Sequence, residues 1–222
     1  MRLAPYIAVA VVVAIALLLA DAPRPCAAGP TLPYEPVTVE RCLTSAECDA
    51  LMRRATPMLR RSMTLGDVVS AVRTSEQAWL AVSDDVVGPI VAKLRARAAQ
   101  LVGVYREDLF EPLQVVRYGP GQEYRPHYDA CVVGCAEGSR IYRRATLLVY
   151  LNDEFEEGAT HFPSVDIRVR PRRGDGELFY NVDADTGTEL DAALHAGEPV
   201  LSGTKWVANC WVRYDPRGRL AL

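Results

Sequence analysis

The chain has 222 residues, of which 50% are apolar and 24% charged, and its formal net charge is −3. This composition is typical of a globular protein and excludes a disordered or fibrous chain. The negative charge, without a long block of basic residues, predicts that nucleic acid is not a partner. Once an N-terminal targeting segment is set aside, the remaining length fits one domain.

The N-terminal segment begins with an apolar run, LAPYIAVAVVVAIALLLA (3–20), that contains no charged residue. This run is just long enough to span a bilayer and slightly long for the core of a signal peptide. We therefore predict that residues 1–22 are either a retained signal-anchor or a cleaved signal peptide. In both cases the rest of the chain would be lumenal, in the endoplasmic reticulum lumen or membrane, or in the secretory pathway after cleavage. The proline-rich residues 23–37 are predicted to form a stiff linker, and residues 38–216 the folded domain.

The chain has six cysteines: Cys26, Cys42, Cys48, Cys131, Cys135 and Cys210. In a translocated protein they permit disulfides. The local pairs Cys42–Cys48 and Cys131–Cys135 are the first to consider, although other pairings stay open. A zinc site is disfavoured because the spacings do not form CxxC pairs.

Two helices are predicted in the first half of the domain. Thr44 and Glu47 have capping-box spacing, and Cys48, Leu51 and Ala55 follow at helical spacing. The second helix is predicted from one apolar stripe, with Asp84 and Asp85 as caps and Pro89 in the first turn. The stripe consists of Val87, Ile90, Val91, Leu94, Ala98 and Leu101.

After Pro112 the chain contains short runs rich in Val, Leu, Tyr and Trp, separated by Gly, Pro, Asn and Asp. The runs are LQVVRY (113–118), ATLLVYLND (145–153), IRVRP (167–171), GELFYNV (176–182), EPVLSG (198–203) and KWVANCWVRY (205–214). Their spacing predicts a β-sandwich or jelly roll, and the two preceding helices should pack on its outside.

The stretch YRPHYDAC (124–131) indicates a metal site. It resembles a β-strand, in which His127 and Asp129 would point to the same face. Two histidines and one carboxylate on one face form the facial triad of non-haem Fe(II) sites. His195 is the candidate for the second histidine. A single His-x-Asp pair is weak evidence, because most such pairs lie on surfaces by chance. His161 is interpreted as an ordinary strand residue, because Pro163 replaces a carboxylate two positions later.

Lys205 strengthens this interpretation. It begins the apolar, tryptophan-flanked run KWVANCWV, where an unpaired ammonium would be costly to bury. Most lysines are solvated, but an anionic ligand would remove the cost here. A dicarboxylic cosubstrate could be held by iron at one end and by Lys205 at the other.

With these residues taken together, the chain resembles the prolyl 4-hydroxylases of the Fe(II)/2-oxoglutarate dioxygenase superfamily. The resemblance covers about residues 38–214 and is carried by five segments taken together. These are CLTSAECDALMRRATPMLRRS (42–62), VRTSEQAWL (72–80), LQVVRYGPGQEYRPHYD (113–129), RRATLLVYLNDEFEEGATHFP (143–163) and LHAGEPVLSGTKWVANCWV (194–212). It implies a mainly β fold, a double-stranded β-helix (jelly roll) core with N-terminal helices packed on the outside.

The resemblance also implies roles for individual residues. His127, Asp129 and His195 would bind iron. Lys205 would pair with the distal carboxylate of 2-oxoglutarate, Tyr118 would add a hydrogen bond, and Thr146 would line the same pocket. Tyr124, Arg143 and Trp211 would face the peptide substrate, although each could instead be an ordinary strand or core residue.

The implied activity is hydroxylation of proline at C4 in collagen-like or cell-wall-like peptides. It would be coupled to oxidative decarboxylation of 2-oxoglutarate to succinate and CO2, and would use Fe(II), O2 and L-ascorbate. Proline-rich segments in a polyproline II shape are already ordered, which favours their binding. The resemblance includes no peptide-binding domain of the animal collagen enzymes, so we expect a monomer, attached to the membrane through its N-terminal helix if that segment is uncleaved.

Two departures and two alternatives bear on the substrate. The family often has a histidine two residues after the position of Trp211, where this chain has Arg213. The family's Glu-Gly-Gly-Glu-Thr is here Glu156-Glu157-Gly158-Ala159-Thr160. The alternatives are a 2-oxoglutarate oxygenase with another substrate and a non-catalytic peptide-binding module. The presence of all three ligands disfavours the second.

Overall fold

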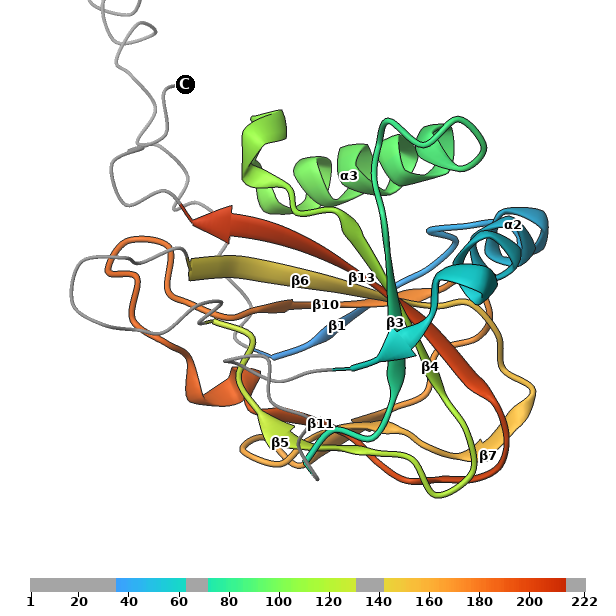
Figure 1. Ribbon diagram of the computed structural model, residues 1–222. Helices are drawn as coiled ribbons and strands as arrows, with labels where there is room; N and C mark the ends of the chain where they lie inside the picture. Colours follow the sequence, from blue (N-terminus) through green and yellow to red (C-terminus); the bar gives the residue numbers. More distant parts are fainter. Residues whose placement is uncertain (1–34, 63–71, 131–141, 215–222) are drawn as a thin grey trace, which may run out of the picture. The chain divides into compact units, whose positions relative to one another are not determined.

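The computed structural model describes residues 35–62, 72–130 and 142–214 (Figure 1). The helices are α2 (Ser45–Ala55) and α3 (Gly88–Val102), with single turns of 3-10 helix at Thr56–Met58, Glu107–Leu109 and Asp191–Ala193. The strands are β1 (Val37–Val39), β2 (Arg60–Arg61), β3 (Glu76–Leu80), β4 (Leu113–Tyr118), β5 (Tyr124–His127), β6 (Tyr142–Tyr150), β7 (Phe155–Glu157), β8 (Thr160–Phe162), β9 (Ile167–Val169), β10 (Gly176–Tyr180), β11 (His195–Gly197), β12 (Val200–Gly203) and β13 (Lys205–Tyr214).

The strands form two main antiparallel layers. The larger sheet has seven strands in the order β1-β10-β6-β13-β4-β3-β2, and the smaller has four in the order β5-β11-β8-β9. The short pair β12-β7 extends the assembly at one end. Because neighbouring strands come from distant parts of the chain, this is the predicted jelly roll and not a simple meander.

Both predicted helices lie on the side of the seven-stranded sheet away from β5 and β11 (Figure 1). Thr44 caps α2 in a complete capping box with Glu47, and Cys48, Leu51 and Ala55 form its buried face. α3 begins at Gly88, with Pro89 in its first turn, and Asp84 accepts hydrogen bonds from the amides of residues 86 and 87. The first-turn proline is thus confirmed, and Asp84, but not Asp85, bonds to the amides that precede the helix, whose N-cap is Val87. Of the predicted stripe, Val87, Val91, Leu94 and Ala98 are buried, whereas Ile90 and Leu101 are half-buried.

The core that supports the site lies between the two sheets. On the larger sheet, Thr146 pairs with Trp211 of β13 and with Phe179 of β10, so these three side chains share one face. Phe179 contacts Phe162 of the smaller sheet edge to face, with ring centroids 5.1 Å apart. Both phenylalanines are fully buried. This face of the larger sheet therefore looks toward the smaller sheet.

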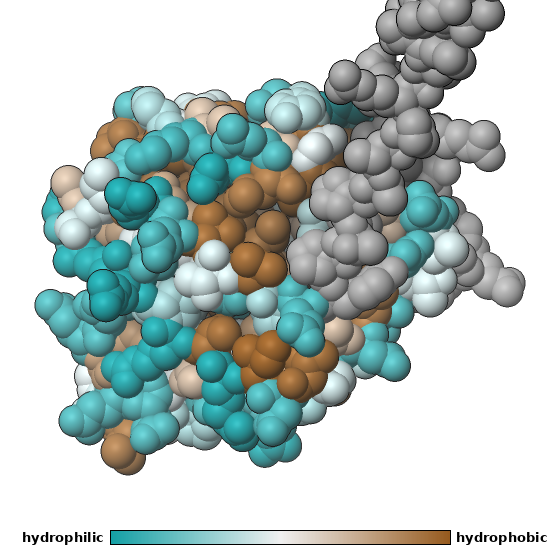
Figure 2. All heavy atoms as spheres, turned by 180° about the vertical axis from the view of Figure 1, so that it is seen from behind, coloured by the Kyte–Doolittle hydropathy of each residue, from teal (hydrophilic) through white to brown (hydrophobic). Residues whose placement is uncertain are grey.

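Outside this core, the surface is mixed. Figure 2 shows that the face turned away in Figure 1 is largely hydrophilic at its rim, with hydrophobic side chains gathered near its centre. The most exposed large apolar side chains among the described residues are Tyr105, Leu201 and Val86. Singly exposed apolar residues of this kind are ordinary and indicate no function.

The predicted location needs a correction. Within residues 35–62, 72–130 and 142–214, no helix is both long and apolar enough to cross a membrane. This finding contradicts the predicted single-pass protein of the endoplasmic reticulum. The predicted targeting segment, residues 1–22, lies outside the described residues, as does nearly all of the predicted linker.

The first disulfide prediction is also wrong. Cys42, Cys48 and Cys210 are buried free thiols, so Cys42 and Cys48 do not pair. Burial raises the pKa of the Cys42 thiol to about 11, which keeps it protonated and unreactive at neutral pH. Cys131 and Cys135 lie outside the described residues.

Candidate metal centre

The pairing of β5 with β11 brings two histidines together. His127, the last residue of β5, lies directly opposite His195, the first residue of β11. Their ring centroids are 4.2 Å apart. Two histidines separated by 68 positions in the sequence therefore meet because two short antiparallel strands place them in register.

Asp129 reaches the histidines in a different way from the one predicted. β5 ends at His127, so Asp129 lies in the bend that follows and not in the same strand. β5 is an edge strand that contains Pro126, which has no amide hydrogen for a ladder. The carboxylate is instead held by two donors from the larger sheet. The Thr146 hydroxyl donates to Oδ2 at 2.9 Å, and the Trp211 indole Nε1 donates to the same oxygen at 3.0 Å.

Three ligand atoms, one from each of these residues, lie within 4.8 Å of one another. His127 Nε2 is 3.7 Å from Asp129 Oδ1, and His195 Nε2 is 3.8 Å from Asp129 Oδ2. These distances are too long for hydrogen bonds but fit donors that surround a common ion. Among the described residues, this is the group of His, Cys, Asp and Glu side chains arranged to hold a metal.

Local hydrogen bonds orient both imidazoles. His127 Nδ1 lies 2.9 Å from the carbonyl oxygen of Arg125, and His195 Nδ1 lies 2.9 Å from that of Ala193. Since a carbonyl oxygen only accepts, each Nδ1 carries the proton and donates it. Each Nε2 is then left with a lone pair directed at the centre of the cluster, the arrangement found in metal-ligating histidines.

The charges of the cluster suit a divalent cation. Burial lowers the pKa of His127 to about 3, so its ring is neutral at physiological pH. Burial would raise the pKa of Asp129, but interactions with the neighbouring His195 and Arg143 and the hydrogen bond from Trp211 outweigh it and hold this pKa well below its usual range. A neutral imidazole and an ionised carboxylate are the forms that bind metals.

Arg143 and Glu111 lie on one side of the cluster. The Arg143 guanidinium covers the Trp211 ring at 3.3 Å from the centroid, and its Nη1 is 3.9 Å from Asp129 Oδ1. Glu111, only 4% exposed, accepts hydrogen bonds from Arg143 at 2.9 and 3.0 Å. The two charges are thus paired bidentately beside the metal cluster.

Lys205 is buried between the sheets, as predicted from its sequence context. It is 2% exposed, and its ammonium donates to the Gly158 carbonyl at 2.7 Å. Gly158 and the preceding Glu157 both have positive φ, 69° and 58°, and a β-carbon at Gly158 would lie 3.0 Å from Val200. This strained turn directs the Gly158 carbonyl toward Lys205. No described carboxylate forms an ion pair with the ammonium.

Tyr118 connects the lysine to the histidine strand. It pairs with Lys205 across β4 and β13, and the ammonium lies 5.6 Å from its ring centroid. A β-carbon at Gly197 would be 3.7 Å from the Tyr118 hydroxyl, and Gly197 is two residues from His195. The buried lysine, this tyrosine and the metal cluster therefore line one continuous interior region.

The other predicted site residues are located as follows. Tyr124 stacks on His127 with ring centroids 3.5 Å apart. Thr146 is fully buried, and it contacts the Asp129 carboxylate and the Asn181 amide. Trp211 is 3% exposed, so its ring is part of the support for Asp129. The roles assigned to these residues in cosubstrate or peptide binding stay predictions.

Sequence reasoning missed three residues that border the cluster. Glu111 precedes a proline between two elements and belongs to no periodic pattern. Arg73 is buried and stacks on the Tyr124 ring at 4.7 Å. Trp79 is 40% exposed and lies 5.8 Å from the Trp211 ring. Arg73 and Trp79 fall within VRTSEQAWL, a segment with the family resemblance but without a motif that identifies single residues.

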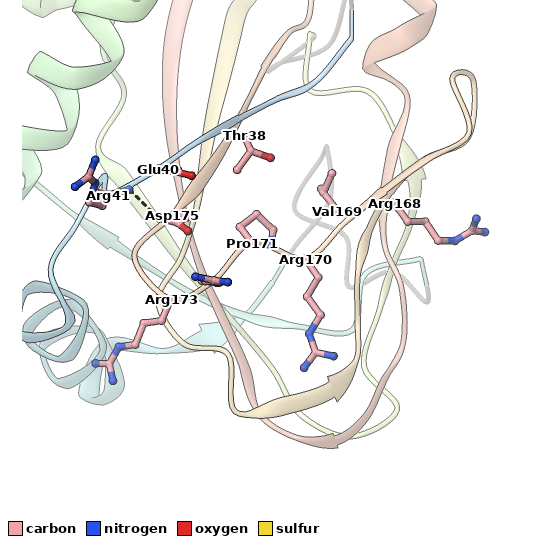
Figure 3. A pocket seen from close by; sticks show the side chains of 10 residues that line it. Thr38, Glu40, Arg41, Arg168, Val169, Arg170, Pro171, Arg173 and Asp175 are labelled. Carbon is pink, nitrogen blue, oxygen red and sulfur yellow. Dashed lines mark hydrogen bonds between the residues drawn. The ribbon is translucent and has the colours of Figure 1, made fainter.

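A separate hollow of about 920 Å³ is rich in arginine (Figure 3). Arg41, Arg168, Arg170, Arg172 and Arg173 line it, together with acidic residues that include Asp175, which accepts a hydrogen bond from the Arg41 amide at 2.7 Å. Figure 3 shows that the labelled arginine side chains spread in different directions and do not converge on one point. None of the metal cluster residues lines this hollow, so it is distinct from the candidate centre.

The fold and the cluster define a class. A jelly roll that carries two histidines and one carboxylate on one side, with a buried lysine further inside, has the ligand set of non-haem Fe(II) oxygenases. The sequence profile of the 2OG-Fe(II) oxygenase superfamily matches residues 113–213, a range that contains all three cluster residues and Lys205.

Individual relatives narrow the class. A prolyl 4-hydroxylase-like protein of Acanthamoeba polyphaga mimivirus is 34% identical over 187 residues, which cover 82% of this chain and 75% of that protein. Prolyl 4-hydroxylase subunit alpha-1 of Mus musculus is 35% identical over 179 residues, and this chain spans only 33% of its length. The crystal structure of the viral collagen prolyl hydroxylase of Paramecium bursaria Chlorella virus-1, in complex with 2-oxoglutarate, superimposes with a TM-score of 0.65 and 30% identity over 81% of this chain and 96% of that one.

The chain belongs to the prolyl 4-hydroxylase family of Fe(II)/2-oxoglutarate-dependent dioxygenases. The predicted family, the jelly-roll fold and the Fe(II) and 2-oxoglutarate requirement are thereby confirmed.

Proposed function

We propose that this protein hydroxylates C4 of proline residues in proline-rich peptides. His127, Asp129 and His195 would hold Fe(II), and Lys205 the distal carboxylate of 2-oxoglutarate. The observation that carries the proposal is the convergence of two imidazole Nε2 atoms and one carboxylate, each fixed by its own hydrogen bonds. When bound, iron and 2-oxoglutarate supply the oxidation: one oxygen atom of O2 enters the substrate, the other enters succinate, and CO2 is released.

The protein residues would position and protect this chemistry. Thr146 and Trp211 hold one oxygen of Asp129, which leaves the carboxylate oriented toward the histidines. Tyr118 and Tyr150 cover the Lys205 ammonium with aromatic rings, at 5.6 and 5.0 Å from the centroids, and so exclude water from it. An anionic carboxylate would replace water as the partner of the ammonium in this apolar space.

For the peptide, aromatic side chains close to the metal would supply the contacts. Tyr124 is half-buried against His127, and Trp79 is partly exposed beside Trp211. Flat aromatic surfaces suit a polyproline II segment, whose rings project at regular intervals. Prolyl hydroxylase relatives support a peptide substrate, including a Trichoplax adhaerens structure in complex with a peptide fragment.

We expect 2-oxoglutarate binding to weaken above neutral pH. Burial lowers the pKa of Lys205 to about 7. Below this value the free protein already carries the ammonium that a carboxylate needs. Above it, binding must take up a proton, so the affinity should fall by up to about tenfold per pH unit. Calorimetric titration of the Fe(II) protein without oxygen, between pH 6 and 9 in buffers of different ionisation enthalpy, would measure both the affinity and the proton uptake.

The control for this pH effect is Lys205→Arg. A guanidinium does not lose its proton in this range, so any binding that remains in the variant should be independent of pH. An affinity of the unmodified protein that stays constant from pH 6 to 9 would contradict the role of Lys205.

The proposed function is tested with synthetic peptides of the Pro-Pro-Gly and Ser-Pro types. We expect incubation with Fe(II), 2-oxoglutarate, ascorbate and O2 to add one oxygen to proline, detected by mass spectrometry, with an equal amount of succinate. His127→Ala should abolish both products. The matched control His161→Ala should retain them, because His161 lies on β8 with its Nδ1 3.5 Å from Glu198 and is not part of the metal cluster formed by the described residues.

The outcomes separate the alternatives. Succinate without peptide modification would indicate a 2-oxoglutarate oxygenase with another substrate. Peptide binding without succinate would indicate a non-catalytic module. Either result would overturn the proposal that this protein is a prolyl hydroxylase.

A further inference from the structure

The residue that replaces the family histidine, Arg213, lies beyond Arg143 as seen from the metal centre. The register of β13 against β6 shifts between Val212 and Arg213, and after the shift Arg213 is directly opposite Arg143. Such irregularities redirect side chains near active sites. Arg143 is the residue that covers Trp211 and approaches Asp129. Arg213 is therefore separated from the metal cluster by one side chain, that of Arg143.

The two arginines share a single acid. Glu111 accepts two short hydrogen bonds from Arg143, while the Nε of Arg213 lies 3.5 Å from Glu111 Oε1. That Arg213 Nε is buried and, among the described residues, has no hydrogen-bond partner. Like charges opposite each other on neighbouring strands are unfavourable unless a counter-charge lies between them. Asp129 also lies 3.9 Å from Arg143, but it would serve as a metal ligand. Among the described residues, Glu111 is then the carboxylate left to balance both guanidiniums, so the group keeps one excess positive charge.

The two arginines differ in exposure, and this difference identifies Arg213 as the one that carries the excess charge. The side chain of Arg143 is 11% exposed, whereas that of Arg213 is 33% exposed. Arg143 is fully engaged by Glu111 and Trp211. The accessible, poorly paired guanidinium is that of Arg213, and it is the group that a ligand approaching from solvent can contact.

We propose that Arg213 gives this enzyme a preference for proline peptides that carry an acidic side chain next to the target proline. The inference rests on the proposed function, which it makes more specific. A substrate carboxylate would supply the second counter-charge that the Arg143–Glu111–Arg213 group lacks. A charge-assisted, bidentate contact between guanidinium and carboxylate is among the stronger polar interactions available to a peptide.

The test compares three fluorescein-labelled peptides of equal length, with Glu-Pro, Ser-Pro or Lys-Pro repeats. Binding to the Fe(II) and 2-oxoglutarate-loaded protein without oxygen is measured by fluorescence anisotropy, and kcat/KM by mass spectrometry in air. We expect the Glu-Pro peptide to bind about tenfold more tightly than Ser-Pro, a typical gain for one charge-assisted contact, and Lys-Pro the most weakly.

Three variants test whether the peptide preference comes from the Arg213 side chain. Arg213→Gln should reduce the difference between Glu-Pro and Ser-Pro to less than about twofold, since it removes the excess charge. Arg213→Lys should restore part of it, a rescue that a purely structural role would not give. Arg172→Gln removes one exposed arginine of the distant hollow and should keep the full preference, which excludes an effect of overall charge.

Equal binding of the three peptides by the unmodified protein would overturn the inference. A preference for Glu-Pro that survives in Arg213→Gln would overturn it as well. If the peptides bind with the expected order but none is hydroxylated, the inference stands and the proposed function fails. If Ser-Pro and Glu-Pro are hydroxylated with equal kcat/KM and bind equally, the proposed function stands and the inference fails.

Discussion

Asp129→Asn is expected to reduce Fe(II) affinity by more than about 100-fold and to abolish succinate formation. Removal of a residue that only supports a metal ligand lowers affinity by up to about 100-fold, and the loss of a direct ligand should exceed this. The substitution removes the negative charge that a divalent cation requires from this ligand set. It keeps the size of the side chain and an oxygen that can accept from Thr146 and Trp211. The protein should therefore fold normally, and the loss should belong to the metal site.

Two measurements decide this prediction. Iron binding is measured anaerobically by competition with a chromogenic chelator, and folding by thermal unfolding. Asp85→Ala is the matched control, because Asp85 is an exposed acid in the turn before α3 and should leave the affinity unchanged. Iron affinity in Asp129→Asn equal to that of the unmodified protein would show that the carboxylate is not a ligand.

Lys205→Met is expected to weaken 2-oxoglutarate binding by at least about 30-fold, since removal of one partner of a buried charge pair costs roughly 2 kcal/mol or more. The same change should leave the Tm of the protein without 2-oxoglutarate equal or higher. In that state the ammonium is buried beside two tyrosine rings and bonded to a backbone carbonyl, with no described carboxylate as an ion-pair partner. Apolar side chains often replace such charges without loss of stability.

The effect of Lys205→Met on the Tm should also depend on pH. Because the pKa of Lys205 in the folded state is about 7, the desolvation penalty is fully present below pH 7. It is lost as the pH rises from about 7 toward the ordinary lysine pKa, so folded-state stability increases over that range. The gain in Tm from methionine should therefore be larger at pH 6 than at pH 9. Lys93→Met, at an exposed site on α3, is the control. It should give neither a larger gain in Tm at pH 6 than at pH 9 nor weaker binding of 2-oxoglutarate.

Local sequence signals predicted the helices and most strands because each is determined by neighbours in the chain. The capping box at Thr44 and the run LQVVRY (113–118) match α2 and β4 as they stand. The site was predicted less completely. His127, Asp129 and His195 could be named from their chemistry, but the strand was expected to include Asp129. Its end at His127 depends on the edge position of β5 and on donors from the other sheet.

Contacts between distant segments account for what was missed. Glu111 gains its importance only because β6 and β13 place Arg143 and Arg213 opposite each other, and no spacing in the sequence encodes that register. Trp211 was assigned to the peptide from the family resemblance, and its role as a support for Asp129 was not foreseen. An aromatic residue in an apolar strand carries no sign of which atoms its indole will contact. Its bond to Asp129 follows from the packing of two layers.

The two layers have a consequence for motion. His127 and His195 belong to the four-stranded sheet, whereas Lys205 belongs to the seven-stranded sheet. A molecule held by the metal at one end and by Lys205 at the other would tie the layers together across the core. Binding would then suppress opening of the sandwich, and amide hydrogen exchange should slow in β5, β11 and β13 together when 2-oxoglutarate binds. Bound cosubstrate would thus hold the two sheets together, and the enzyme would be most rigid when it is ready to react.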